Sequence, residues 1–197
     1  LGGDARMRLL ARMMAAEGYD VCSWELSGAP NECALCDALR SEIIVLPLPA
    51  EKNGCLSGTE LTMERLLRSL RPEHRVFAGN VSRDAAALAQ SLGLHMTDYF
   101  AAEELSVRNA IPTAEGAIEL AMKHTSVTLH GAPCLVLGFG RIGKVLAHDL
   151  TALGAKVSVS ARKRSDLAWI DAFGYAPLHT NRLSGALGAF RVVFNTV

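Results

Sequence analysis

The spacing of hydrophobic and polar positions along the chain predicts helices that alternate with short strands. Apolar residues that recur every three or four positions are typical of helices, and short unbroken apolar runs are typical of buried strands. In the first part of the chain, helices are predicted over 4–18, 32–40, 62–70 and 83–92. Strands are predicted over 19–24, 41–48, 75–78 and 94–97, with a loop over 51–54. This alternation favours a parallel sheet covered on both faces.

A second α/β unit is indicated by a glycine motif that follows an apolar strand over 134–137. The motif, G-x-G-x-x-G over 138–143, leads into a predicted helix that ends at Leu153, and a strand over 156–160 follows. In such a unit Gly138 permits the tight turn, Gly140 lets the backbone approach a pyrophosphate, and Gly143 lets the helix pack closely. The whole loop is therefore a candidate dinucleotide site: Gly138, Phe139, Gly140, Arg141, Ile142 and Gly143.

The residues that follow the next strand indicate which dinucleotide binds. An acidic residue about 20 positions after the first glycine would bond the ribose of NAD. Here the stretch from Ser160 to Arg164 contains no acid and carries Arg162, Lys163 and Arg164. Arginine binds a 2′-phosphate through paired hydrogen bonds. We therefore expect NADP rather than NAD, held by Ser160, Arg162 and Arg164.

The final apolar stretch, over 192–197, is predicted to be a further strand of the same sheet. Cofactors bind at the carboxyl ends of such strands, so Asn195 and Thr196 are expected to flank the ribose or the nicotinamide. The equally open alternative is that both are ordinary residues of a strand-end turn.

The predicted architecture is two doubly wound parallel-sheet domains joined by a bridging helix. We expect a flavodoxin-like substrate domain over 1–112, a bridging helix and linker over 113–130, and a Rossmann dinucleotide-binding domain over 131–197. Pro112 is predicted to open the bridging helix. The chain begins on a glycine turn without a strand before it and ends on a strand, so we expect it to be a fragment.

Composition and charge exclude several classes of function. Lys plus Arg and Asp plus Glu are both 20, which gives no general attraction to nucleic acid or to an anionic membrane surface. No apolar run reaches the roughly 18 residues that cross a bilayer, and we expect a cytoplasmic protein. The five cysteines are expected to be free thiols. Cys33 and Cys36 form a C-x-x-C without a second pair, so no metal site is predicted and redox use is the minor alternative.

Four segments together resemble a known family. They are the GGDAR stretch over 2–6, the NAIPTAEGA stretch over 109–117, His130 to Ala132, and the glycine loop. These segments, in this order, resemble the A subunits of bacterial dipicolinate synthase. The resemblance implies an enzyme that works with a flavoprotein-like B subunit to oxidise dihydrodipicolinate to dipicolinate. It also implies action in the cytoplasm of the mother cell during sporulation, and we expect an oligomer.

A dicarboxylate substrate needs cations or helix N-termini in its site. Arg6 follows the first glycine turn and is a candidate carboxylate ligand, with a surface arginine as the alternative. Asn109 and Thr113 are further candidate substrate contacts, with Thr113 predicted to cap the bridging helix. Glu115 is a candidate proton acceptor and, with Thr113, a candidate catalytic residue.

Two other functions are also compatible with the sequence. One is a different two-domain dehydrogenase, of the type that acts on 2-hydroxyacids or alanine. The other is a regulatory subunit that binds NADP without chemistry of its own.

Overall fold

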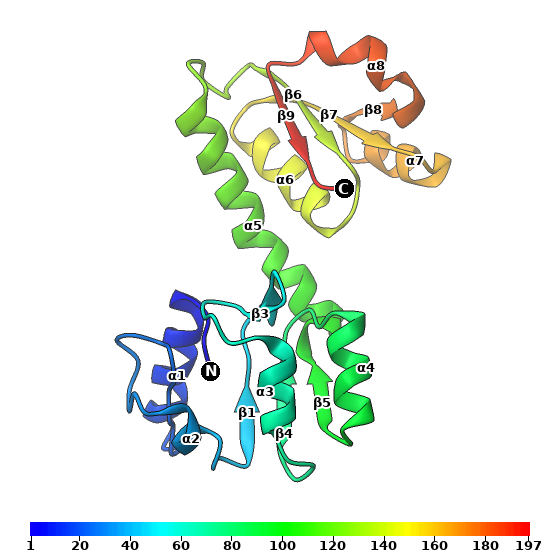
Figure 1. Ribbon diagram of the computed structural model, residues 1–197. Coiled ribbons are helices and arrows are strands. Elements are labelled where there is room, and N and C mark those ends of the chain that lie inside the picture. The colour runs from blue at the N-terminus through cyan, green and yellow to red at the C-terminus, as the bar shows by residue number, and fades with distance from the viewer. The chain divides into compact units, whose positions relative to one another are not determined.

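The computed structural model describes residues 1–197 and divides them into two compact units, Leu1–Glu103 and Glu104–Val197 (Figure 1). Both are mixed α/β units built on parallel sheets, so the predicted fold class is confirmed. None of the helices combines the length and the apolarity needed to cross a bilayer.

The first unit is built on three parallel strands in the order β1-β4-β5. Ile44 of β1 pairs with Val76 of β4, which pairs with Met96 of β5. Its elements are α1 (Ala5–Ala16), α2 (Leu35–Ala38), β1 (Ile43–Val45), β2 (Glu51–Lys52), β3 (Cys55–Leu56), α3 (Met63–Ser69), β4 (Arg75–Ala78), α4 (Arg83–Ser91), β5 (His95–Asp98) and a 3-10 turn over Tyr99–Ala101.

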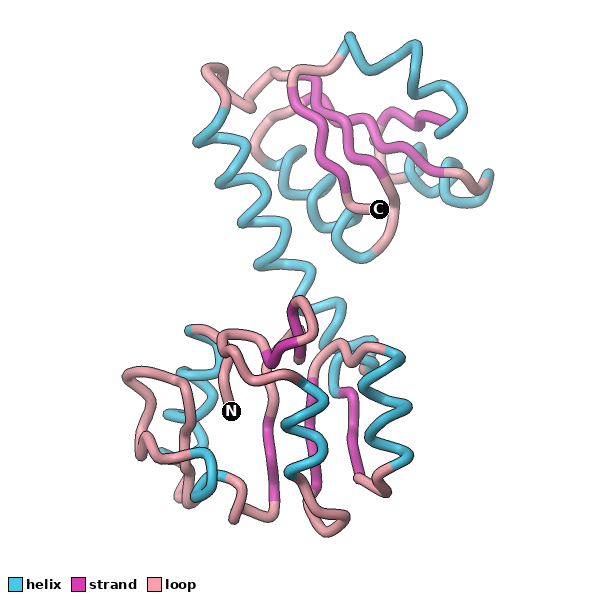
Figure 2. Tube along the Cα trace, viewed as in Figure 1, coloured by secondary structure: helices cyan, strands magenta, loops and turns pink.

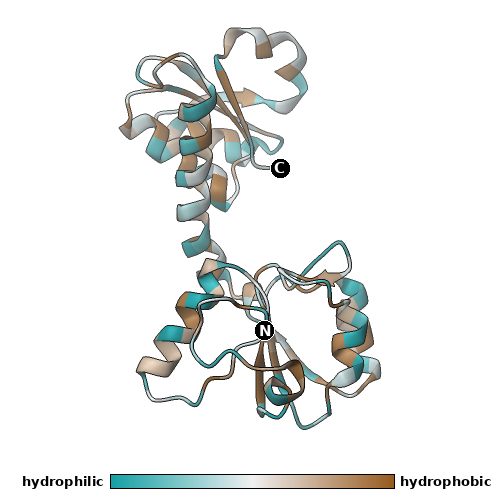
Figure 3. Cartoon of the chain, turned by 60° about the vertical axis from the view of Figure 1, so that its left-hand side comes forward, coloured by the Kyte–Doolittle hydropathy of each residue, from teal (hydrophilic) through white to brown (hydrophobic).

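The core of this unit lies where the strands meet α3 and α4. Ile44, Leu46 and Val76 are buried against Leu66 and Leu67 of α3. Brown strand segments are visible in this unit in the hydropathy colouring of Figure 3. Burying side chains of this size contributes about 2 kcal/mol each, which fixes the strand ends that form the carboxyl edge of the sheet.

Three local predictions in this unit are wrong. The segment 51–54 is not a plain loop, because β2 and β3 form an antiparallel hairpin around Asn53 and Gly54. The segment 19–24 is not a strand, because its one ladder contact is a bridge from Ser23 to Glu32. The helix predicted over 32–40 is limited to the four residues of α2.

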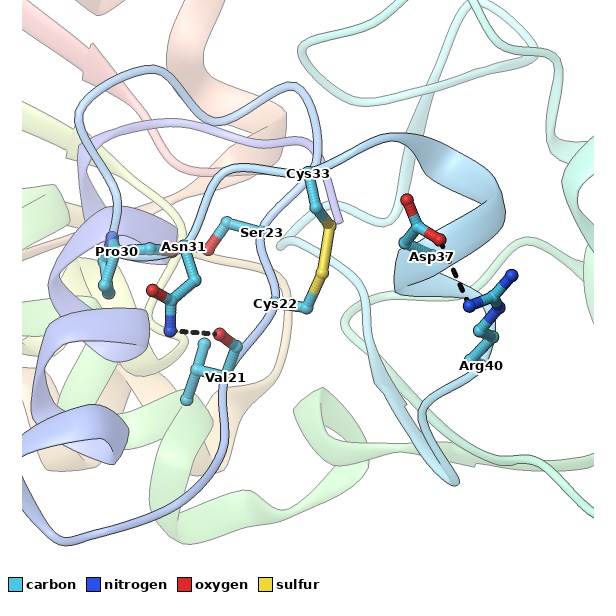
Figure 4. Close-up of a disulfide and its surroundings, with 8 residues drawn as sticks. All are labelled: Val21, Cys22, Ser23, Pro30, Asn31, Cys33, Asp37 and Arg40. Carbon is cyan, nitrogen blue, oxygen red and sulfur yellow. Dashed lines mark hydrogen bonds and ion pairs between the residues drawn. A yellow bond between two sulfur atoms is a disulfide. The ribbon is translucent and has the colours of Figure 1, made fainter.

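The prediction that all five cysteines are free thiols is wrong. Cys22 and Cys33 form a disulfide (Figure 4). Cys36, Cys55 and Cys134 are free. Spacing alone does not reveal the pair, because the two cysteines are brought together by a loop rather than by a regular element.

A single long helix, α5 (Glu103–His124), includes the predicted bridging segment. The prediction that Pro112 opens this helix is wrong, since Pro112 lies inside it, nine residues after the first helical position. The predicted domain boundary at residue 112 therefore falls within α5, and the two compact units divide at Glu103 and Glu104 instead. Ala114 and Ile118 on this helix pack into the core of the second unit.

The second unit has four parallel strands in the order β8-β7-β6-β9 (magenta in Figure 2). Val136, Val159 and Phe194 lie buried on neighbouring strands, against Leu146 and Leu150. Its elements after α5 are β6 (Pro133–Leu137), α6 (Arg141–Ala152), β7 (Lys156–Ala161), α7 (Arg164–Ala172), β8 (Ala176–His179), α8 (Leu183–Ala186) and β9 (Val192–Asn195), with 3-10 turns over Thr180–Arg182 and Leu187–Ala189.

Candidate functional site

The glycine loop of the second unit joins β6 to α6 at the carboxyl edge of the sheet. Gly138 has φ +102°, and its amide donates to the Ser160 carbonyl at 3.0 Å. A side chain at this position would place Cβ 2.9 Å from the Thr196 hydroxyl. Gly138 is therefore required both by its backbone conformation and by the close approach of the residues after β9.

Gly143 is buried in the first turns of α6. A Cβ there would collide with the Gly138 carbonyl and lie 3.2 Å from the Thr196 hydroxyl. The absence of a side chain thus lets α6 begin directly against the loop that precedes it.

Gly140 has the opposite environment. It is the N-cap of α6, no side chain caps that helix, and a Cβ at Gly140 would meet no atom within 4 Å. Uncapped first-turn amides and the helix dipole favour an anion at this end. Arg141, the first residue of α6, is exposed at the same end. The loop is therefore shaped to admit a phosphate group against its backbone.

Phe139 and its neighbours form an aromatic row beside this loop. The Phe139 ring lies 6.2 Å from Phe173, which lies 5.5 Å from Trp169 of α7. The Lys144 ammonium lies 5.3 Å from the centre of the Phe139 ring. Phe139 and Ile142 are both partly buried, so the loop offers a ligand mainly its backbone.

The end of β7 carries the basic residues predicted to select the cofactor. Ser160 is only 3% exposed, and its carbonyl bonds Gly138. Arg162, Lys163 and Arg164 are exposed and form no ion pair. Ser160 thus positions the glycine loop, while three unneutralised cations stand at the surface next to it.

β9 lies beside β6, so the strand order reverses between β7 and β9 at the glycine loop. Ligands of doubly wound sheets bind at such a reversal. The Thr196 hydroxyl donates to the Leu137 carbonyl at 2.8 Å, and the Asn195 side chain accepts from the Val197 amide at 3.1 Å. Both side chains therefore have local structural partners at the edge where cofactor contacts are predicted.

Arg6 lies at the carboxyl edge of the first sheet. Its guanidinium donates from Nε and Nη2 to the Asp4 carboxylate, with an Nη2–Oδ2 distance of 2.8 Å, and from Nη2 to the Leu48 carbonyl at 2.6 Å. These bonds occupy three of its five N–H donors and leave Nη1 without a partner. Arg6 can therefore offer an anion Nη1 from a fixed position.

Asp4 is not among the predicted site residues, although its i, i+2 spacing from Arg6 could have indicated the pair. Its carboxylate also accepts the Arg6 amide at 2.9 Å and caps α1. The hydrogen bond from the Arg6 side chain lowers the pKa of Asp4 below its ordinary value of 3.8. The pair is well formed but exposed, so its strength is limited by solvent.

Tyr99 lies at the same edge and is also absent from the predicted residues. Its hydroxyl donates to the Leu46 carbonyl at 3.0 Å, and its ring fills the space beside Gly79. Burial raises the pKa of the Tyr99 phenol, and the Arg6 charge opposes this shift. A neutral phenol and a fixed guanidinium are thus near one another on the first unit.

The predicted substrate residues of α5 lie within the helix rather than at its start. Thr113 is not an N-cap, because its hydroxyl donates to the Asn109 carbonyl at 2.7 Å in an unbroken helix. Residues two positions apart on a helix point about 160° away from each other. Thr113 and Glu115 therefore lie on opposite sides of α5, whereas Asn109 and Thr113 share one side.

Comparisons with known proteins agree with this architecture. The family model for the N-terminal domain of the dipicolinate synthase A subunit matches residues 1–100. The dipicolinate synthase A subunit of Bacillus subtilis (strain 168) is 29% identical over an alignment 214 positions long, which spans 100% of this chain and 71% of the relative.

Solved structures extend the likeness to the second unit. The crystal structure of the dipicolinate synthase A subunit from Bacillus halodurans matches with a TM-score of 0.84 and 27% identity, covering 100% of this chain and 72% of that one. The transhydrogenase of Sinorhizobium meliloti shares the fold, with a TM-score of 0.64 at 15% identity over 99% of this chain and 64% of that one. The predicted resemblance is thereby confirmed: the chain belongs to the family of dipicolinate synthase A subunits.

Proposed function

We propose that this chain supplies the NADP-binding and substrate-binding part of a dipicolinate synthase, which oxidises dihydrodipicolinate to dipicolinate during sporulation. The observation that carries the proposal is the uncapped glycine loop beside the unpaired Arg162, Lys163 and Arg164. The B subunit is the proposed partner, and the proposed location is the mother-cell cytoplasm, because the family resemblance implies both.

The residues present fit a nicotinamide dinucleotide. The space over Gly140 accommodates the pyrophosphate, and the uncapped amides of α6 bind its charge. Arg162 and Arg164 bind the 2′-phosphate, while Asn195 and Thr196 border the crevice beside the nicotinamide half. When bound, the oxidised cofactor accepts a hydride at nicotinamide C4, and the substrate ring loses one proton as it becomes aromatic.

The substrate is a dicarboxylate, so its site needs fixed cations. Arg6 binds one carboxylate through the free Nη1, because Asp4 and Leu48 hold the other donors in place. Asn109 and Thr113 are proposed substrate contacts on one side of α5. Glu115 is the proposed proton acceptor only if the substrate lies on the other side, so these two assignments exclude each other.

Substitutions on α5 distinguish these assignments. With the B subunit present, Thr113→Val and Glu115→Gln are compared for kcat and KM on dihydrodipicolinate. We expect only one of the two to reduce turnover by more than tenfold. Equal losses in both variants would contradict the assignment of the substrate to one side of the helix.

Calorimetric titration with NADPH and NADH tests the cofactor. We expect NADPH to bind at least tenfold more tightly, which corresponds to about 1.4 kcal/mol. Arg162→Ala and Arg164→Ala should each remove most of that preference. Arg191→Ala is the matched control, because Arg191 is exposed and unpaired but precedes β9 at the opposite edge of the sheet.

The outcomes separate the competing functions. A preference for NADH would overturn the 2′-phosphate assignment but not the reaction class. NADPH binding without turnover, even with the B subunit, would favour a regulatory subunit.

A further inference from the structure

The first unit contains three cysteines within fifteen residues that the proposed function does not use. Cys22 and Cys33 are joined, with Cα atoms 6.3 Å apart, and Cys36 follows Cys33 at the C-x-x-C spacing. Cys36 is exposed and carries a free thiol. Two cysteines at this spacing can be linked to each other, and thiolate attack on a disulfide sulfur exchanges its partners.

The disulfide is open to solvent rather than enclosed by the core. Cys22 and Cys33 line a surface hollow of about 590 Å³ together with Asn31, Asp37 and Arg40. Figure 4 shows the ion-paired Asp37 and Arg40 beside the disulfide. Access is one of the conditions that govern the rate of thiol attack on a disulfide. The other free cysteines lie elsewhere, since Cys55 belongs to β3 and Cys134 is buried in β6.

The loop that the disulfide closes is also held by hydrogen bonds. The Ser23 carbonyl accepts a hydrogen bond from the Cys33 amide at 2.8 Å, and the Ser23 amide donates one to the Asn31 carbonyl at 3.0 Å. The Ser23 hydroxyl donates to the Pro30 carbonyl at 2.9 Å, and the Asn31 side chain donates to the Val21 carbonyl at 3.0 Å. Because these four hydrogen bonds do not involve sulfur, the loop can keep its shape when the disulfide opens.

We propose that Cys22, Cys33 and Cys36 form a thiol–disulfide exchange centre, in which Cys22 and Cys36 compete for Cys33. The Cys36 thiolate attacks the Cys33 sulfur, a Cys33–Cys36 bond forms, and the Cys22–Cys33 bond breaks. Cys22 leaves as a thiolate and takes up one proton, which balances the proton that Cys36 lost. The exchange moves no net electrons and needs no external oxidant or reductant.

The exchange has a structural consequence at a second place. Cys22 also lines an apolar groove of about 350 Å³ between α1 and β1, where Met7, Leu10 and Ile43 are among its neighbours. Release of Cys22 changes its side chain on one wall of this groove from a disulfide to a thiol. The centre therefore couples thiol chemistry at the surface to packing against the first sheet.

Disulfide mapping of the whole chain tests the proposal. The protein is equilibrated with reduced and oxidised glutathione at mildly alkaline pH, its free thiols are alkylated, and its peptides are identified by mass spectrometry. We expect both Cys22–Cys33 and Cys33–Cys36 linkages in the unmodified chain. Cys36→Ser should retain only the first linkage, Cys22→Ser should form only the second, and Cys55→Ser should change neither.

Three results would overturn the proposal. The first is a Cys22→Ser variant, folded by circular dichroism, in which Cys33 and Cys36 are never linked. The second is an unmodified chain in which only Cys22–Cys33 is ever found. The third is an unmodified chain in which all five cysteines are alkylated without reduction. If Cys22→Ser does not fold, the linkages of the unmodified chain and of Cys36→Ser still decide the question.

Discussion

Each unit has a glycine turn that leads into a twelve-residue helix, but the two turns differ in what they leave open. Before α1, the Asp4 carboxylate caps the helix and bonds Arg6. The Gly58 backbone also closes on Gly3, since a Cβ on Gly58 would lie 2.6 Å from the Gly3 carbonyl. Before α6, no side chain caps the helix at Gly140, and a Cβ added to Gly140 would meet no atom within 4 Å.

The difference explains why only one of the two turns is suited to bind a phosphate. The Asp4 carboxylate already caps the amides at the start of α1, so a phosphate cannot bind them there, although the outer Nη1 of Arg6 stays open to a carboxylate. No side chain caps α6 at Gly140. A glycine turn before a helix is therefore not sufficient, and the absence of a cap is what favours a phosphate.

The largest effect on stability and on NADPH binding is expected from Gly143→Ala. The added Cβ meets the Gly138 carbonyl and the Thr196 hydroxyl, so the start of α6 must shift. Overpacking of this kind costs about 3 kcal/mol, and NADPH binding should be lost as well. Chemical unfolding and calorimetry measure the two effects; an unchanged midpoint of unfolding would contradict the close packing inferred at Gly143.

Gly140→Ala should separate binding from folding. The free protein has room for this Cβ, so the free energy of unfolding should change by less than about 1 kcal/mol. A bound pyrophosphate has no such room, and NADPH affinity should fall at least tenfold, or about 1.4 kcal/mol. Gly58→Ala is the converse control, because it should destabilise the first unit and leave NADPH affinity unchanged.

Asp4→Ala should cost about 1 kcal/mol through loss of the helix cap. Asp4→Asn retains the cap and should cost less, because the exposed ion pair with Arg6 contributes little by itself. The pKa of Asp4 is lower in the folded protein than its ordinary value of 3.8. The stabilisation that the ionised Asp4 gives the folded state is therefore complete above pH 3.8 and is lost as the pH falls through the pKa of the folded protein. Unfolding midpoints against pH should therefore converge for Asp4→Asn and the unmodified chain only in acid.

The smallest effect is expected from Gly116→Ala in α5. A Cβ at this helical position meets no atom within 4 Å, and alanine favours a helix over glycine by about 0.8 kcal/mol. We expect a small increase in the unfolding midpoint without any change in cofactor affinity. Destabilisation would indicate that α5 packs more tightly at Gly116 than the structure describes.

The second unit is the easier of the two to predict, because its signals are local. An apolar run, a glycine motif and a second apolar run follow one another without interruption, and each glycine has one physical reason to be there. Ser160 is only partly predictable. Its position at the end of β7 is predictable, but its burial depends on neighbouring strands that no short window reveals.

The first unit and α5 are harder for different reasons. Asn53-Gly54 is a strong hairpin signal that the interpretation as a loop overlooks, and both residues have the positive φ of such turns. Pro112 has a φ suited to either a helix start or a helix interior, so its dipeptide context cannot decide between them. The Asp4–Arg6–Leu48 contact joins residues more than forty positions apart, which only the folded chain brings together.

The two tryptophans give each unit its own optical reporter, and one of them belongs to the aromatic row beside the glycine loop. The chain has two tryptophans, and they fall in different units. Trp24 packs against the core of the first unit, while Trp169 is 56% exposed and joins Phe139 through Phe173. Fluorescence of Trp24→Phe and Trp169→Phe variants would therefore follow the unfolding of one unit at a time, and the emission of Trp169 would respond to events at the glycine loop.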